Sequence, residues 1–521
     1  MKNILMPFLL LALAATAPVH AAVSVPTVAV SLADFGITPG TTVWGSAKLQ
    51  KAIDAASSTG KRLDIPEGEY LLAPDGLFDD EDKGYATYCA ANLRSNTHIR
   101  GAKGAVFKVA NNQSTDSAPK SMGVFCTNQV LQNVSIVGLT VDMNGARNKI
   151  SPSRPSEYSR FNQSAVLVSG TPGGVAAAMS NVLLENNVFK NNPGVSTICM
   201  AQSNARGVHL GKRWTLRRNS FLNNGLDTDD QSVVFGWADD VVVDGNTFAN
   251  DRPFGSAGKT GINTGYEVHG SNHRLTNNKF KNAMRGIWVS SNYSSPVRGT
   301  VISNNTFDTL FYGVDFFRTI PTLTPIYDTE ITGNVFRFDD TRVPSVPRLD
   351  FKAGVQVASE YAQQQITVKK NQFFKKGTSL ASAALVVTPG VIPGQMHDQI
   401  VFEENEGEGV TFGTFIRTSP VNGLGDISAR YNHWRSLTPA GAYDISSGDA
   451  VLFTQSPKQI RMLRLGGGSC TDARSVPQTT YCMTLTGDVS TLSLSPSKSS
   501  GMKRKAFIEE GLNVRSRKGS F

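Results

Sequence analysis

An asparagine followed two positions later by phenylalanine recurs through the middle of this 521-residue chain. The copies begin at Asn187, Asn219, Asn246, Asn278, Asn305, Asn334 and Asn371, and two degenerate copies begin at Asn405 and Asn432. Successive asparagines lie 27 to 37 residues apart. A near-regular repeat of this length is typical of solenoids, propellers and arrays, in which each repeat buries its apolar face only by stacking on its neighbours.

Two short apolar runs accompany each asparagine and indicate the type of repeat. One run, such as Val241–Val243, precedes the asparagine, and a second, such as Gly286–Ser290 or Gly313–Phe317, follows later in the repeat. Both runs alternate with a period of two and are too short for helices, and a propeller would need four strands per repeat. We therefore predict an all-β fold, a single-stranded right-handed parallel β-helix. The asparagine amides should stack at a left-handed corner, and the phenylalanines should stack inside.

Composition divides the chain into five segments. Residues 1–21 are typical of a secretory signal peptide, with Lys2, an apolar run Ile4–Ala15 and a small-residue cleavage site at Val19–Ala21. We expect an N-terminal cap and first coil over 22–92, the β-helix over 93–440, a small β cap over 441–497 and a basic, disordered tail over 498–521. The apolar run is too short to cross a bilayer. The chain is therefore expected to be exported, periplasmic or secreted, without a transmembrane segment.

The first coil of a solenoid exposes an edge that invites aggregation, and the sequence offers a cover for it. Residues 46–56 predict a helix with Ser46 as its N-cap, Leu49 and Ile53 on one face, and Gly60 as its stop. A helix laid over the first coil would protect that edge.

Cysteine usage and charge restrict the compartment and the partner. We predict the disulfides Cys470–Cys482 and Cys89–Cys126, with Cys199 buried and free, which suits an oxidising compartment. The formal net charge is +9. No recognition motif favours nucleic acid, so an acidic polysaccharide or an anionic cell surface is the expected partner. The alternative is that the charge only aids solubility, and the oligomeric state is open.

The N-terminal region carries a family resemblance. Asp34-Phe-Gly36, Leu49-Gln with Ile53, and Ile65-Pro-x-Gly-x-Tyr70 resemble the N-terminal signature of the pectin-lyase-like superfamily, which includes polygalacturonases, phage tailspike depolymerases and alginate-modifying enzymes. With the repeats, the resemblance covers roughly residues 30–440. It implies an exported enzyme that degrades an acidic, uronate-containing polysaccharide by glycosidic hydrolysis or β-elimination. Neither the polygalacturonase motifs nor the pectate lyase Arg-x-Pro-x-x-Arg motif is present, so a uronate-polymer epimerase and a non-catalytic carbohydrate-binding adhesin remain alternatives.

Aligning the strands predicts one outward-facing column of mostly polar or aromatic residues: His209, Val234, Glu267, Trp288, Asp315 and Gln356, with His269 and Phe317 at the next outward position. Glu267 and Asp315 would be two coils apart, or roughly 9.5 Å along the stack. This is the upper edge of the spacing at which two carboxyl groups can act as acid and base around a water. We predict Glu267 and Asp315 as the catalytic pair, assisted by His269 and Arg285, with Trp288 stacking on sugar. The alternative is that these charges only solvate a surface.

Further candidates lie around the same face. Asp230 could replace one catalytic carboxylate, and Asp227 and Asp229 could bind Ca²⁺, although such aspartates also commonly cap a bend. The residues expected to bind an anionic sugar are His209, Lys259, His273, Arg318, Tyr158 and Arg160. Two long insertions, Met143–Gln163 and Asn250–Thr264, would form the walls of a cleft. No cofactor other than a possible Ca²⁺ is expected.

Overall fold

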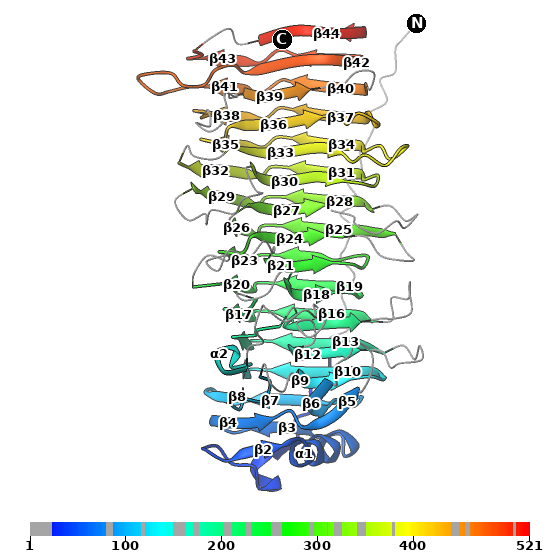
Figure 1. The fold of residues 1–521 in the computed structure, drawn as a ribbon, viewed down its shortest axis with the longest axis vertical. Coiled ribbons are helices and arrows are strands. Elements are labelled where there is room, and N and C mark those ends of the chain that lie inside the picture. Colours follow the sequence, from blue (N-terminus) through cyan, green and yellow to red (C-terminus); the bar gives the residue numbers. More distant parts are fainter. Residues whose placement is uncertain are drawn as a thin grey trace, which may run out of the picture.

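The computed structural model is an elongated stack of parallel strands with a helix at its N-terminal end (Figure 1). It describes residues 23–79, 87–115, 120–148, 163–169, 177–194, 196–202, 211–225, 231–251, 263–290, 296–309, 311–316, 326–340, 351–377, 381–438, 448–453, 459–503 and 507–520. Each full coil contributes one strand to each of three faces. The all-β parallel β-helix is confirmed.

The strands follow one another along the three faces. The first face holds β6 (Thr87–Asn92), β9 (Ser121–Thr127), β12 (Gln163–Ser169), β15 (Ile198–Gln202), β18 (Gln231–Gly236), β21 (Asn263–Val268), β24 (Arg285–Val289), β27 (Tyr312–Phe316), β30 (Phe351–Ser359), β33 (Ala381–Pro389), β36 (Phe412–Arg417) and β39 (Gly448–Phe453). The second face holds β1 (Ala29–Ser31), β3 (Arg62–Ile65), β7 (His98–Gly101), β10 (Val130–Val137), β13 (Ala178–Glu185), β16 (Lys212–Arg217), β19 (Asp239–Asp244), β22 (Arg274–Thr276), β25 (Val297–Ser303), β28 (Ile326–Thr332), β31 (Gln364–Lys369), β34 (Asp398–Glu403), β37 (Leu424–Arg430) and β40 (Ile460–Gly466). The third face holds β2 (Val43–Gly45), β4 (Gly68–Ala73), β8 (Ala105–Val109), β11 (Thr140–Asp142), β14 (Val188–Lys190), β17 (Ser220–Leu222), β20 (Thr247–Ala249), β23 (Lys279–Lys281), β26 (Thr306–Asp308), β29 (Val335–Asp339), β32 (Gln372–Lys376), β35 (Glu406–Glu408), β38 (His433–Arg435), β41 (Ser469–Thr471) and β43 (Lys498–Ser500).

Besides the helices at the N-terminal end, three strands and one short helix of the described residues lie outside this regular order. The long strands β42 (Met483–Ser495) and β44 (Phe507–Lys518) run through both the first and the second face and pair with each other. A short strand β5 (Gly76–Asp79) pairs antiparallel with β6. A four-residue helix α2 (Gly145–Asn148) follows β11.

The predicted asparagine ladder lies between the second and third faces. All nine asparagines are buried, and the Oδ1 atom of each one from Asn219 onward accepts hydrogen bonds from the backbone N–H and side-chain amide of the preceding one, at 2.8–3.1 Å. The left-handed corner lies one residue earlier than predicted. The residue before each ladder asparagine has the positive φ, for example Asn186 (54°) and Arg218 (53°). Because the bend occurs there, the ladder amide is free to satisfy backbone groups of the adjacent coils.

The phenylalanine ladder is also confirmed, inside the third face. From Phe189 to Phe373 the rings of successive coils stack with centroids 4.7–5.3 Å apart. In the two degenerate copies of the motif, Gly407 and Trp434 take the place of the phenylalanines. A Cβ at Gly407 would lie 2.7 Å from the ring of Trp434, so glycine leaves the space that the tryptophan of the next coil fills. Trp434 also packs against Phe402, with centroids 6.2 Å apart.

A helix covers the first coil as predicted, with a different cap. A short 3-10 helix η1 (Leu32–Phe35) precedes α1 (Ser46–Ser58), which buries Leu49, Ala52, Ile53 and Ala56. The N-cap is Gly45, and Ser46 is the first helical residue. The backbone N–H of Ser46, which has no partner within the helix, donates to the Asp75 carboxylate at 2.7 Å. Gly60, with φ of 64°, lies just beyond the C-cap Thr59.

The C-terminal boundaries differ from the prediction. The coils do not end near residue 440, because β39 pairs with β36 and β40 pairs with β37 in the same parallel register. The predicted disordered tail is also wrong over β43 and β44, which form the last coil. Leu512 and Val514 of β44 are half-buried against the core, and this apolar contact offsets the polar composition of the segment.

The predicted disulfides Cys89–Cys126 and Cys470–Cys482 are both present, and Cys199 is a buried thiol.

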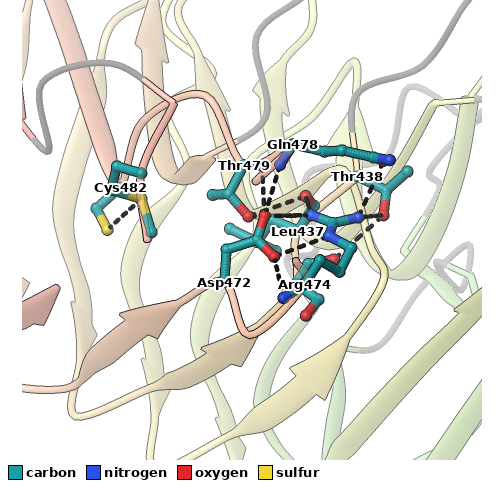
Figure 2. A network of polar contacts seen from close by, with 9 residues as sticks. Leu437, Thr438, Asp472, Arg474, Gln478, Thr479 and Cys482 are labelled. Carbon is teal, nitrogen blue, oxygen red and sulfur yellow. Dashed lines mark hydrogen bonds and ion pairs between the residues drawn. The ribbon is translucent and has the colours of Figure 1, made fainter. Parts of the chain in front are cut away.

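A polar network centred on Asp472 holds the loop that Cys470–Cys482 closes (Figure 2). The Asp472 carboxylate accepts hydrogen bonds from the backbone N–H groups of Gln478 and Thr479, both at 2.8 Å, and from the Arg474 guanidinium at 2.6 Å. Arg474 also donates to the Leu437 carbonyl, at 2.8 Å, which ties the loop to the preceding coil. Burial alone would raise the pKa of Asp472, but the hydrogen bonds from Arg474 and the backbone outweigh it and hold the pKa well below its usual range.

Candidate functional site on the first face

Four of the predicted outward residues form one column on the first face. Glu267 of β21 pairs in register with Trp288 of β24, Trp288 with Asp315 of β27, and Asp315 with Gln356 of β30. Glu267 and Asp315 are therefore two coils apart, as predicted, which separates their backbones by roughly 9.5 Å. The residues beside them in each strand, such as Tyr266 and Val314, are fully buried in the core, so the alternation of the strands is also as predicted.

The column extends differently before Glu267. Phe235, rather than Val234, lies opposite Glu267, and Val234 pairs with the inward Tyr266. β18 has no opening glycine to set its phase, and a slip of one residue exchanges the two faces of a strand. Cys199 of β15 precedes Phe235 in the column. The strand expected near Gly207 and its His209 lie outside the described residues.

The two carboxylates are far less exposed than a solvated surface would require. Glu267 is 5% exposed and Asp315 is 2% exposed, whereas Phe235, Trp288 and Gln356 are partly exposed. Around Glu267 and Asp315 the first face is therefore a shielded polar layer outside the apolar core, in which electrostatic interactions are stronger than in water.

Glu267 is held by two side chains. Its Oε2 accepts a hydrogen bond from the Ser232 hydroxyl, and its Oε1 contacts Nε2 of His269, both at 2.5 Å. The His269 ring in turn stacks on Trp237, with centroids 5.2 Å apart and planes at 22°, and lies 4.8 Å from the Phe235 ring. His269, predicted to assist the two carboxylates, thus contacts Glu267 directly, and both groups have a fixed orientation.

Asp315 pairs with Arg285 inside the same layer. Its Oδ2 lies 2.8 Å from Nε of Arg285, whose side chain is 5% exposed. The guanidinium also lies over the Trp288 ring, 4.4 Å from its centroid, and donates to the Thr264 hydroxyl at 3.3 Å. Burial raises the pKa of Asp315 above its ordinary value, and the charge of Arg285 and its hydrogen bond oppose part of that rise. The other carboxylate oxygen, Oδ1, is buried and has no hydrogen-bond partner among the described residues.

Tyr312 extends the site on the side of Asp315. Its hydroxyl hydrogen-bonds to Gln356, and burial, with a smaller contribution from the Asp315 charge, raises its pKa to about 12. The phenol is therefore a neutral hydrogen-bonding group at physiological pH. The sequence does not predict four residues of this site: Tyr312, Ser232, Phe235 and Trp237. Phe235 and Trp237 repeat the spacing of Glu267 and His269 one strand earlier, and that signal could have identified them.

His273 does not reach this face. It is fully buried at a corner, where Nδ1 contacts the Tyr266 hydroxyl at 3.0 Å and Nε2 contacts the Ala238 carbonyl at 2.7 Å. Its predicted role in sugar binding is wrong, because both ring nitrogens serve the core. The other candidates lie outside the described residues: Asp227, Asp229, Asp230, Lys259, Arg318, Tyr158, Arg160 and Phe317, together with most of both insertions.

Within the residues given above, no three His, Cys, Asp or Glu side chains are grouped so that they could hold a metal ion. No helix in these ranges is long and apolar enough to cross a membrane.

Comparison with known proteins identifies the fold. The family model described as a right handed beta helix region matches residues 196–388. Among solved structures, a double mutant of the tailspike protein of E. coli bacteriophage HK620 has a TM-score of 0.63 at 16% identity, and covers 93% of this chain and 80% of its own. The chain thus shares the right-handed β-helix fold of these structures. Other matches to this β-helix are mutants of the same tailspike in complex with a pentasaccharide (TM-score 0.63, 16% identity) and a hexasaccharide (0.59, 15%), with the same coverage. No curated protein matches the chain.

Proposed function

We propose that this β-helix binds a polysaccharide across its first face and hydrolyses a glycosidic bond there, with Glu267 and Asp315 as base and acid. The observation that carries the proposal is the pair of buried carboxylates in one outward column, two coils apart and on either side of Trp288. The oligosaccharide complexes named for the tailspike structures support a glycan as the ligand.

The spacing supports a direct displacement by water. A separation of about 6.5–9.5 Å between carboxyl groups leaves room for a water between base and sugar and is typical of inverting glycosidases. In the proposed reaction Glu267 takes a proton from the water that attacks the anomeric carbon. Asp315 gives its proton to the glycosidic oxygen as the bond from that carbon to the leaving sugar breaks. Glu267 gains one proton and Asp315 loses one, and exchange with solvent restores both groups.

Each carboxyl group has an environment suited to its role. The raised pKa of Asp315 favours the protonated acid, and Oδ1 is the oxygen that can deliver the proton because Oδ2 contacts Arg285. The Ser232 hydroxyl and His269 hold Glu267 toward the same column. Trp288, partly exposed between the two carboxyls, offers a ring face for a sugar.

Hydrolysis is favoured over β-elimination by the position of Arg285. A lyase requires a cation beside the sugar carboxylate to stabilise the enolate-like intermediate. Arg285 is already held by Asp315, Trp288 and Thr264, so we assign it to positioning Asp315. The net charge of +9 supports an acidic polymer as the substrate through long-range attraction.

We also propose that the chain is exported. The two disulfides support folding in an oxidising compartment, and the pattern of residues 1–21 supports a cleaved signal peptide. Sequencing the N-terminus of protein recovered from outside the cytoplasm should give Ala22 as the first residue. An intact Met1 on that material would contradict cleavage.

The function is tested on a panel of polysaccharides that includes polygalacturonate, alginate and a neutral xylan. We expect new reducing ends without the ultraviolet absorbance of unsaturated ends, and proton NMR should show that the first product has the inverted anomeric configuration. Glu267→Gln and Asp315→Asn should each lower kcat on the order of 10²-fold or more. Glu330→Gln, an exposed carboxylate on the second face, is the matched control and should keep full activity. Absorbance at unsaturated ends would identify a lyase, and near-wild-type activity of both variants would refute the catalytic assignment.

A further inference from the structure

A polar hollow of about 270 Å³ lies on the third face, on a different side of the coil from the Glu267–Asp315 column. Outward side chains of β32, β35, β38 and β41 line it. The ionisable ones are Glu406, Glu408, His433 and Arg435. Phe374 contributes a partly exposed ring at one end. All these residues lie on regular strands, so their arrangement follows directly from the register.

Glu408 and Arg435 occupy neighbouring coils in register but do not pair. Neither side chain forms a hydrogen bond or an ion pair with another residue in the described part of the chain. The same two positions on β11 and β14 of this face hold Asp142 and Lys190, which do form an ion pair, at 3.3 Å. The hollow therefore presents an acid and a base side by side, both available to a ligand.

The backbone under the hollow is well fixed. At one side, the ladder amides of Asn371, Asn405 and Asn432 link the three coils. At the other, the left-handed residues Gly409 and Ser436 donate backbone hydrogen bonds to the next coil, at 3.2 and 2.7 Å. A ligand would thus meet a preformed surface and would not have to order a loop.

The charges select the class of ligand. An anion would be attracted by Arg435 but repelled by Glu406 and Glu408. A cation would be attracted by the two glutamates but repelled by Arg435. A neutral sugar avoids both conflicts, because each hydroxyl can donate to a carboxylate and accept from a guanidinium. The apolar face of a sugar ring could also lie on Phe374.

We propose that this hollow is a second saccharide-binding site, which holds a neutral sugar residue of a glycan between Glu408 and Arg435. Binding here involves no residue of the proposed reaction and continues in a chain whose first face is inactive. The site would anchor the protein on a glycan while the first face acts elsewhere on the polymer.

The test is a glycan array probed with labelled full-length protein, followed by titration of the bound glycans. Glu408→Ala with Arg435→Ala should weaken binding of glycans that contain neutral hexoses by about tenfold or more, which corresponds to the loss of charge-assisted hydrogen bonds. The matched control is Lys279→Ala with Lys281→Ala, which removes two exposed charges from β23 of the same face and should leave binding unchanged. Trp288→Ala reports on first-face binding, and thermal unfolding of each variant checks the fold.

The outcomes separate this site from the proposed function. Loss of binding in the Glu408/Arg435 variant, with binding kept in Trp288→Ala, supports the second site, whether or not the chain cleaves any polymer. Binding lost only in Trp288→Ala, or unchanged in the Glu408/Arg435 variant, overturns it. Failure of the wild type to bind any glycan also overturns it. The same holds if light scattering shows a dimer for the wild type and a monomer for the Glu408/Arg435 variant, since a second copy of the chain would then occupy the hollow.

Discussion

At a pH above the pKa of Asp315, where its carboxylate is ionised, replacing Asp315 with asparagine leaves the Arg285 guanidinium charged and without its carboxylate, at a position where the two side chains are 2% and 5% exposed. Breaking a buried ion pair by removing one partner costs about 3–5 kcal/mol, because the remaining charge is uncompensated. Arg285→Met should cost a similar amount, with about 0.5–2 kcal/mol added by the lost contact between the guanidinium and the Trp288 ring. Replacing both partners with apolar residues of similar size, in Arg285→Met with Asp315→Leu, should restore the free energy of unfolding to within about 1 kcal/mol of the wild type.

Urea denaturation of the wild type and the three variants measures this coupling. The transitions followed by circular dichroism and by tryptophan fluorescence must coincide for the free energies to be compared. We expect a coupling free energy of about 3 kcal/mol or more. The matched control is Glu404→Gln, which breaks the exposed pair Lys370–Glu404, 3.7 Å apart, and should change stability by less than about 1 kcal/mol. Additive single and double variants would refute the buried pair and, with it, the positioning role of Arg285.

Three further predictions concern the scaffold. Phe280→Ala removes a ring that is 1% exposed within the phenylalanine ladder and should cost about 3–5 kcal/mol in urea denaturation, so a loss below about 1 kcal/mol would contradict the packing. Asn305→Ala deprives the buried Asn278 of the acceptor for its backbone N–H and should cost about 1–3 kcal/mol, and faster hydrogen exchange at the Asn278 amide would identify the cause. The lowered pKa of Asp472 contributes stability that is present above about pH 4 and lost as the pH falls through the folded-state pKa. Asp472→Asn should therefore lower Tm at pH 7 by more than at pH 3, and an equal difference at both values would contradict this.

Local patterns in the sequence determine most of the fold. The Asn-x-Phe repeat predicts both ladders because each coil must satisfy its buried backbone groups and fill its core from the same two positions. The shared phase of the strands that open with glycine places Glu267, Trp288, Asp315 and Gln356 in one column, since side chains alternate strictly along a strand. The disulfide pairs followed from sequence as well.

Tertiary structure decides where a pattern is interrupted and what lies next to each side chain. Without an opening glycine, β18 shifted by one residue from its expected phase and placed Phe235 in the column instead of Val234. Histidine is a residue type that often binds ligands, but both ring nitrogens of His273 contact groups of the core, the Tyr266 hydroxyl and the Ala238 carbonyl. The tail that appeared too polar to fold joins the last coil because strand pairing with β42 satisfies its backbone.

The candidate site shows the same division between what the sequence and the structure supply. Which residues share a face depends on spacing along the chain, and the sequence determines it. The burial of Glu267 and Asp315, and the choice of Ser232 and Arg285 as their partners, depend on contacts between coils 30 or more residues apart. Burial and these contacts determine the chemistry of a carboxyl group, because the free energy of a charge depends on its surroundings in three dimensions.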